Sequence, residues 1–205
     1  MTRRTSRSAM NDDRRTAFDG LYAAHGRAVL AYALRRVTQP ADAEDIVAET
    51  FLVAWRRLAD APGPPDTLLP WLYAFARRVL ANQRRANDRR ARLHLRVRQL
   101  PAVIDAVSDD DQDGPAIAAL SCMRPDDQEL LRLVAWEELS HAQIAVVLGI
   151  TPNAVAIRLY RARARFEDEF ANHVEQDHGK GIGPCRTSKG SKGRMFGRIR
   201  REQAK

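Results

Sequence analysis

The chain has 205 residues, of which 44% are hydrophobic and only 6% aromatic, so any core must consist mainly of aliphatic side chains. This length suits one ordinary domain or two small ones. The formal net charge of +8 favours a polyanionic partner, most often nucleic acid. No apolar run approaches the length of a membrane span, and the basic N-terminus is not followed by a signal-peptide core. We therefore expect a cytoplasmic protein with no membrane insertion.

Charge is distributed unevenly along the chain. Residues 77–98 hold nine arginines and one aspartate, residues 176–205 hold nine lysines or arginines and two acids, and residues 105–113 hold five aspartates. The acidic stretch and the Lys/Gly-rich C-terminus both lack a core-forming pattern. We expect three segments without fixed structure: a disordered N-terminus (1–13), a flexible acidic linker (93–114) and a disordered basic tail (173–205).

Apolar residues with a period near 3.6 predict three helices in an N-terminal domain, residues 14–92. The first helix covers residues 16–37, the second covers residues 42–58 just after Pro40, and the third starts near Asp66 or Thr67. Proline suits a first helical turn, where its missing N–H costs nothing. The expected inward faces are Phe18, Leu21, Tyr22, Ala28, Val29, Tyr32 and Ala33 in the first helix, Ile46, Val47, Thr50, Phe51, Ala54, Trp55 and Leu58 in the second, and Trp71, Leu72, Phe75 and Val79 in the third.

The stretch "SHAQIAVVLGITPNAVAIRLYRARAR", residues 140–165, predicts a helix-turn-helix. Ser140 and Gln143 form an S-x-x-Q capping box that starts the first of its helices. Gly149 lies where the chain must turn sharply, and Thr151 offers an N-cap hydroxyl to the second helix. Extended alternation of period two is absent. The expected fold is therefore all-α, with two small helical domains joined by a flexible linker and a helix-turn-helix in the C-terminal one, residues 115–172.

The second helix of this motif combines an apolar face with a basic one. Val155, Leu159, Ala162 and Phe166 are spaced i, i+4, i+7 and i+11, and so face the core. An exposed basic helix fits the DNA major groove, where arginine pairs with guanine or neutralises phosphate. A two-helix corner with solvated surface arginines is the alternative. The expected DNA-binding residues are Asn153, Ala156, Ile157, Arg158, Tyr160, Arg161 and Arg163, with Arg165 further along toward the phosphates.

Three stretches in order resemble bacterial RNA polymerase sigma factors of the extracytoplasmic-function (ECF) type. They are "DAEDIVAETFLVAWRRL", "PWLYAFARRVLANQRR" and the terminal helix-turn-helix, and the resemblance covers roughly residues 14–172. Each motif is moderately specific alone, and the ordered set is highly specific. The resemblance implies a transcription initiation factor, typical of stress responses, that directs core RNA polymerase to promoters. The implied partners are core polymerase, promoter DNA and an anti-sigma factor, with no cofactor, metal or small-molecule substrate.

By this resemblance, the helix at 42–58 is the main polymerase-binding element. Its residues independently place a mixed acidic and apolar patch on the outward face, which suits a partner helix. One alternative is a solvated acidic face, and another is a nuclease in which the acids of this helix bind Mg²⁺. The expected polymerase-binding residues are Asp42, Asp45, Glu49, Leu52 and Arg56.

By the same resemblance, the third helix melts the promoter and reads its element near minus ten, while the helix-turn-helix reads the element near minus thirty-five. Arginines and aromatic residues suit a separated DNA strand, although Trp71 fits a core position equally well. The expected residues for the downstream element are Trp71, Arg77, Arg78, Asn82, Arg85 and Arg89.

The chain departs from the commonest ECF pattern at several of these positions. Ala48, Arg78 and Asn82 stand where Gln, Asn and Asp are frequent. Ala156 and Ile157 replace residues that are often polar, so base readout should depend mainly on the neighbouring arginines. These departures bear on which bases are recognised and on one assumed polymerase contact.

A stand-alone helix-turn-helix regulator, which binds an operator and no polymerase, is the main alternative function. The outward patch around Glu49 and Leu52 discriminates between the two, because a repressor has no need of it. No nucleophile lies beside a base at a familiar spacing, and no glycine-rich loop precedes a helix in the manner of a phosphate site. We therefore expect no enzymatic activity.

Overall fold

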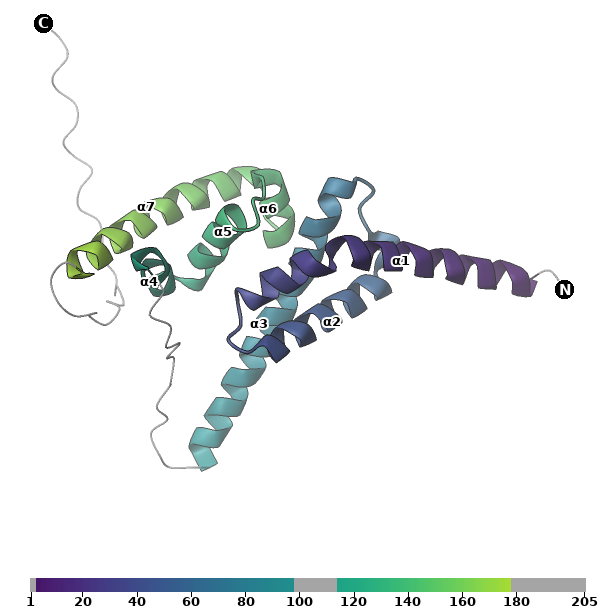
Figure 1. Ribbon diagram of the computed structural model, residues 1–205, viewed down its shortest axis with the longest axis horizontal. Coiled ribbons are helices and arrows are strands. Elements are labelled where there is room, and N and C mark those ends of the chain that lie inside the picture. Colours follow the sequence, from purple (N-terminus) through teal and green to yellow (C-terminus); the bar gives the residue numbers. More distant parts are fainter. Residues whose placement is uncertain (1–2, 98–113, 178–205) are drawn as a thin grey trace, which may run out of the picture.

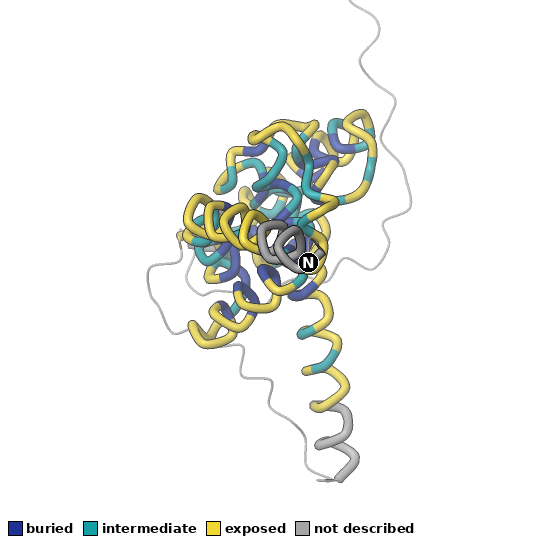
Figure 2. The backbone as a smooth tube through the Cα atoms, turned by 90° about the vertical axis from the view of Figure 1, so that its right-hand side faces the viewer, coloured by how far each residue is buried: buried dark blue, intermediate teal, exposed yellow. Residues whose placement is uncertain are grey.

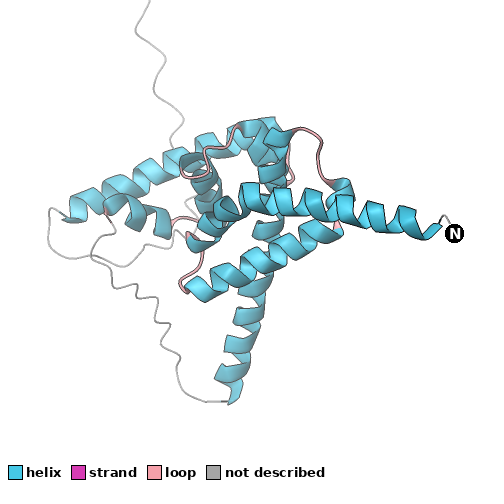
Figure 3. Cartoon of the chain, turned by 45° about the vertical axis from the view of Figure 1, so that its right-hand side comes forward, coloured by secondary structure: helices cyan, strands magenta, loops and turns pink. Residues whose placement is uncertain are grey.

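The computed structural model describes residues 3–97 and 114–177, with side chains described for residues 12–90 and 114–174. Every regular element in these ranges is a helix, which confirms the all-α expectation (Figure 3). Three long helices and one short 3-10 helix, η1, make up the N-terminal domain, and four helices make up the C-terminal domain (Figure 1). The bounds are α1 Arg3–Leu34, α2 Pro40–Arg56, η1 Leu58–Asp60, α3 Pro65–Val97, α4 Pro115–Cys122, α5 Pro125–Ala135, α6 His141–Leu148 and α7 Pro152–Asp177.

Proline is the first residue of five of the seven α-helices in the described ranges, namely α2, α3, α4, α5 and α7. The ring fixes φ near the helical value, and the absent N–H is one that a first turn leaves unpaired anyway. These prolines therefore determine where most helices begin. Pro70 is different, because it lies inside α3, beyond the first turn.

The helices α1, α2 and α3 pack around an apolar core (Figure 1). Val29, Tyr32, Ile46 and Leu72 are fully buried in it, as the periodicity predicts. Tyr22 differs from the prediction, since its side chain is 52% exposed at the margin of the stripe and only the ring edge packs on Phe51. Phe18, Ala28, Trp55, Leu58 and Trp71 are half-buried rather than buried.

The helix α1 starts at Arg3, so the expected disorder of residues 1–13 is wrong for residues 3–13. No glycine or proline occurs from Arg3 to Asp19 to interrupt the helix. Arg14, which directly follows this stretch, anchors α1 to α2. Its Nη2 donates to the backbone oxygen of Trp55 at 2.6 Å, and its guanidinium lies 4.6 Å from the centre of the indole ring.

Two further boundaries lie beyond the expected ones. The helix α3 continues to Val97, so the predicted linker is helical over residues 93–97, and α7 continues to Asp177, so the predicted tail is helical over residues 173–177. Good helix formers without glycine or proline fill the end of α3. Figure 2 shows the preceding turns of α3, up to Arg90, extending from the body with mostly exposed residues. The remainder of the predicted linker and tail lies outside the described residues.

The two domains are in contact. The helix α3 packs against α6, and most of the buried apolar residues of both domains form one continuous cluster. In the described ranges, no single helix is long and apolar enough to cross a membrane. The helices α6 and α7 reach that length and hydropathy only as a pair that is bent by 97°.

Candidate nucleic-acid interface

The turn between α6 and α7 has the predicted local geometry. The Ser140 hydroxyl accepts from the backbone N–H of Gln143 at 3.3 Å, and the Gln143 side chain accepts from the backbone N–H of Ser140 at 2.9 Å. The helix ends at Gly149, whose φ of 67° lies in the left-handed region that glycine adopts without strain. The capping box and the glycine together fix the length of α6 and the direction of the chain after it.

The helix α7 starts with the second predicted cap. The Thr151 hydroxyl accepts from the backbone N–H of Ala154 at 3.2 Å. Val155, Leu159 and Ala162 are buried against the rest of the domain, as their spacing predicts, whereas Phe166, the fourth expected core residue, is half-buried. This inward face determines which residues α7 presents outward.

The outward face of α7 is basic with an apolar centre. Ile157 is 46% exposed and Tyr160 is 78% exposed at the centre of this face. Ala156 is half-buried. The remaining predicted residues of this face are all exposed, namely Asn153, Arg158, Arg161 and Arg163. The structure thus presents the predicted set on one continuous surface of a helix-turn-helix.

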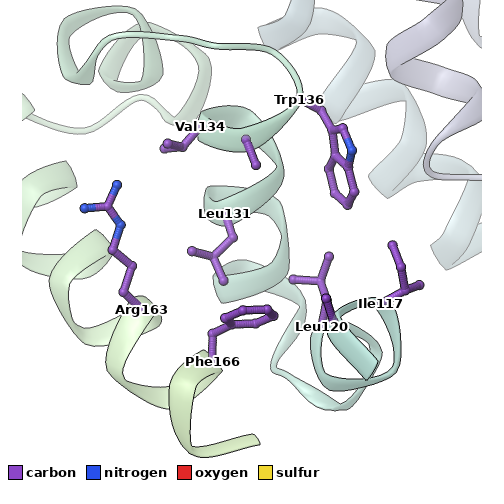
Figure 4. Close-up of a pocket in the computed structure, with 9 residues that line it drawn as sticks. Ile117, Leu120, Leu131, Val134, Trp136, Arg163 and Phe166 are labelled. Atoms are coloured by element: carbon purple, nitrogen blue, oxygen red, sulfur yellow. The ribbon is translucent and has the colours of Figure 1, made fainter. Parts of the chain in front are cut away.

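Arg165 lies differently from the expectation that it extends toward phosphate. Its Nη1 donates to the Asp127 carboxylate at 2.6 Å, so it joins α7 to α5. Arg163 is exposed but also borders an apolar cavity of about 370 Å³. Figure 4 shows Arg163 and Phe166 of α7 facing Leu131 and Val134 of α5 across this cavity. The basic contact surface of α7 therefore ends near Arg163.

A second basic surface lies on α3. Arg78, Asn82, Arg85 and Arg89 are exposed, and Arg85 donates to the Asn82 side-chain oxygen at 2.8 Å. Two residues predicted for this surface are half-buried and contact other residues of the protein. Arg77 is half-buried, with Nη2 3.8 Å from the Asp126 carboxylate of α5. Trp71 is half-buried and packs edge-on against Phe75, with ring centres 4.6 Å apart, which agrees with its alternative core role.

The helix α2 presents the predicted acidic and apolar patch. Leu52 is 48% exposed in the middle of it. Among the described residues, no group of three His, Cys, Asp or Glu side chains could hold a metal ion. The exposed patch consists of Asp42, Asp45, Glu49, Leu52 and Arg56.

A set of charged residues at the domain boundary was not predicted from the sequence. Arg36 lies just after α1, and its side chain is 1% exposed in contact with Glu129 and Glu137 of the C-terminal domain. The partners are about a hundred residues apart in the chain, and local periodicity carries no signal for such a pair. A run of two arginines at a helix end ordinarily indicates a solvated C-terminus.

Each domain of the chain matches a known sequence family. Residues 21–90, which contain most of the N-terminal domain, match the family described as Sigma-70 region 2, and residues 115–166 match Sigma-70, region 4. SigL of Mycobacterium tuberculosis, an ECF RNA polymerase sigma factor, is 30% identical over 156 residues, which cover 69% of this chain and 82% of SigL. The chain belongs to the ECF family of RNA polymerase sigma factors. Each matched region of this sigma factor carries one of the two basic surfaces.

Other relatives differ in length or only share the fold. The probable RNA polymerase sigma factor RfaY of Xanthomonas campestris is 29% identical over 167 residues, and the chain spans 42% of its length. The sigma factor RpoE of Bartonella quintana, solved in complex with the anti-sigma factor NepR, aligns with a TM-score of 0.56 at 22% identity. That alignment covers 75% of this sigma factor and 96% of RpoE, and it supports the two-domain helical fold.

Proposed function

We propose that this chain is a transcription initiation factor that binds core RNA polymerase and directs it to specific promoters. The observation that carries the proposal is the ordered pair of matched regions, each with an exposed surface suited to its role. The first region presents an acidic and apolar patch on α2 and basic residues on α3. The second presents the basic face of α7.

In this proposal, α7 enters the major groove of the element near minus thirty-five. Arg158 and Arg161 lie in its first three turns, where a recognition helix reaches base edges, and arginine pairs bidentately with guanine. The exposed Ile157 offers an apolar contact to a thymine methyl group. Arg163 lies further along and contacts phosphate.

The N-terminal domain acts on the element near minus ten. Its exposed arginines on α3 attract the phosphates of a separated strand, and Asn82 can donate to and accept from an unpaired base. The patch on α2 binds core polymerase, which carries out the chemistry, so this chain catalyses no reaction. The protein acts in the cytoplasm, and the NepR-bound RpoE supports an anti-sigma factor as a further partner.

The test is co-purification of the intact protein with core RNA polymerase, together with a gel shift on duplex DNA. We expect association with polymerase and only weak duplex binding by the free protein, because its DNA surface is split between two small domains. A tight, sequence-specific shift without any association with polymerase would instead support the stand-alone regulator.

A further inference from the structure

We propose that an ionic latch holds the free protein in a closed form that cannot span a promoter, and that the latch must open when the protein engages polymerase and DNA. The latch consists of Arg35 and Arg36 in the N-terminal domain and Glu129 and Glu137 in the C-terminal domain. This proposal rests on the proposed function at one point, namely that the protein must contact two promoter elements a known distance apart.

Arg36 is the centre of the latch. Its Nε donates to Glu129 Oε2 at 2.9 Å and its Nη1 donates to Glu137 Oε1 at 3.0 Å. Arg35 Nη2 donates to the other oxygen of Glu137 at 2.5 Å. The side chains of Arg36 and Glu137 are each 1% exposed, so these charges are removed from water only while the two domains are together.

Two tyrosines of the N-terminal domain complete the surroundings of the carboxylates. Tyr32 donates to Glu129 at 2.7 Å and Tyr73 donates to Glu137 at 3.4 Å. The Arg36 guanidinium also lies 3.5 Å from the centre of the Tyr32 ring, a cation–π contact. Both glutamates of the C-terminal domain are therefore held by donors from the opposite domain.

A second contact reinforces the closed form where α6 meets α3. Pro70 has no N–H, so the carbonyl of Asp66, four residues before it in α3, lacks its usual helical donor. The Gln143 side-chain nitrogen donates to this carbonyl at 3.1 Å, while its oxygen completes the capping box of α6. The helix-turn-helix thus docks on the position that proline leaves open in the promoter-melting helix.

The hydrogen-bonding groups buried between the two domains are not all paired, which suits an interface that opens. The Nε atoms of Arg35 and Arg132 are buried there without a hydrogen-bond partner in the structure. Burial lowers the pKa of Arg132, and the nearby positive charge of Arg36 lowers it further. A buried polar network with unpaired donors is less stable than a fully paired or apolar one. The closed form is therefore less stable than a fully hydrogen-bonded interface would be, and separation of the domains hydrates these unpaired donors.

The closed form also brings the two DNA surfaces too close together. The helix α3 packs on α6 and α6 packs on α7, and packed helix axes are about 8–10 Å apart, so the start of α7 lies within about 20 Å of α3. Following α3 as far as Arg89 adds at most about 35 Å. Elements near minus ten and minus thirty-five are roughly 25 base pairs apart, or about 85 Å along the duplex. One closed molecule cannot contact both elements.

The experiment uses the full chain and charge reversal at the latch. The latch variant is Glu129→Lys with Glu137→Lys, and the rescue variant adds Arg35→Glu with Arg36→Glu, which restores opposite charges. The matched control is Glu167→Lys with Asp168→Lys, the same change of charge at exposed positions of α7. Small-angle scattering gives the radius of gyration, and titration with core polymerase gives the affinity. Circular dichroism checks the helix content, and if the Lys variants lose it, Glu129→Gln with Glu137→Gln replaces them.

We expect the latch variant to have a larger radius of gyration and to bind core polymerase at least about tenfold more tightly. The reason is that a larger fraction of the free protein is then already in the open form that binds polymerase. The rescue variant should return both quantities toward wild type, and the control should change neither. An unchanged radius, or an expansion with no gain in affinity, would overturn the proposal. If the wild-type protein does not bind polymerase at all, the proposed function fails, and the radius alone then decides whether the latch exists.

Discussion

Arg36 and Glu137 form a buried ion pair across the domain boundary, with Nη1 and Oε1 3.0 Å apart. Removing one partner of such a pair costs about 3–5 kcal/mol if the other charge stays buried. In the proposed latch the other charge does not have to stay buried, because it is hydrated when the two domains separate. The pair therefore acts on the equilibrium between closed and open forms more than on the folding of either domain.

Arg36→Lys should weaken the closed form although it keeps the positive charge. Lysine is a point charge, and it cannot reproduce the fork that contacts Glu129 and Glu137 together. We expect a loss of about 1–3 kcal/mol in the free energy of unfolding of the closed protein, measured by urea denaturation. Arg57→Lys is the control, since Arg57 pairs with Asp60 on an exposed surface and should change stability by less than about 0.5 kcal/mol. Equal effects of the two substitutions would contradict the role of Arg36.

The closed form should loosen in alkaline solution. Burial raises the pKa of Tyr32 and of Tyr73 above the usual 10.0, and the adjacent carboxylates of Glu129 and Glu137 raise both further, while Arg35, Arg36 and Arg77 act in the opposite direction. A raised phenol pKa means that the closed form holds the proton more tightly than the open form. The stabilisation is therefore complete below about pH 10 and is lost as the pH rises above it.

Scattering and tyrosinate absorbance against pH test this prediction. The radius of gyration should be constant from neutral pH to about pH 9 and should increase above about pH 10 together with the absorbance. Tyr32→Phe with Tyr73→Phe removes both phenols, and should remove the alkaline expansion. An expansion of the same size in this variant would show that other groups cause it.

The caps of the helix-turn-helix should contribute measurably to stability. Ser140→Ala removes one half of the capping box and should cost about 1 kcal/mol. Gly149→Ala should cost about 1–2 kcal/mol through backbone strain alone, because an added Cβ meets nothing within 4 Å. Gly63→Ala is the matched control, since its Cβ also meets nothing but its φ is not left-handed. Thermal unfolding should show a loss for Gly149→Ala and no loss for Gly63→Ala.

The arginines of α7 should fall into separate groups. Arg158→Ala or Arg161→Ala should cost about 1–3 kcal/mol at the cognate upstream element and relax the preference at particular base pairs. Arg163→Ala should weaken all sequences about equally and reduce the salt slope by about one. Arg165→Ala should instead destabilise the C-terminal domain, because this side chain pairs with Asp127.

Binding of reconstituted holoenzyme to single-base variants of the upstream element measures these differences. If all four variants lose affinity uniformly and no base position is relaxed, α7 only positions the protein and sequence is read elsewhere.

The patch on α2 should be required for association with polymerase. Asp45→Arg with Leu52→Asp reverses one exposed charge and removes the exposed apolar side chain, so binding should be abolished while the circular dichroism spectrum stays the same. Glu167→Arg, a charge reversal on exposed α7, should bind normally. The measurement is retention of core polymerase on the immobilised protein, and retention by the double variant would show that polymerase binds elsewhere.

Local features could be predicted from the sequence because their causes are local. The Ser140–Gln143 capping box, the turn at Gly149 and the buried face of α7 each depend on residues within a few positions, and the structure confirms them. The helix at residues 3–13 was missed because a polar, basic stretch resembles a disordered one, while Arg14, just after it, contacts Trp55 on another helix.

The long-range contacts could not be predicted in the same way. Arg36, Arg77 and Arg165 all appear as solvent-facing or DNA-facing charges in a periodicity analysis, yet each pairs with an acid far along the chain, across the domain boundary for Arg36 and Arg77 and within the C-terminal domain for Arg165. Whether an arginine is free for DNA or paired within the protein depends on tertiary packing, which the spacing of apolar residues does not encode.

The central claim is that this chain gives core RNA polymerase its choice of promoter. The most direct measurement is in vitro transcription by purified core polymerase on a library of genomic fragments, with and without the intact protein, followed by mapping of the transcript 5′ ends. The account predicts starts that appear only with the protein, that share two elements roughly 25 base pairs apart, and that disappear with Asp45→Arg/Leu52→Asp. An identical set of starts with and without the protein would contradict it.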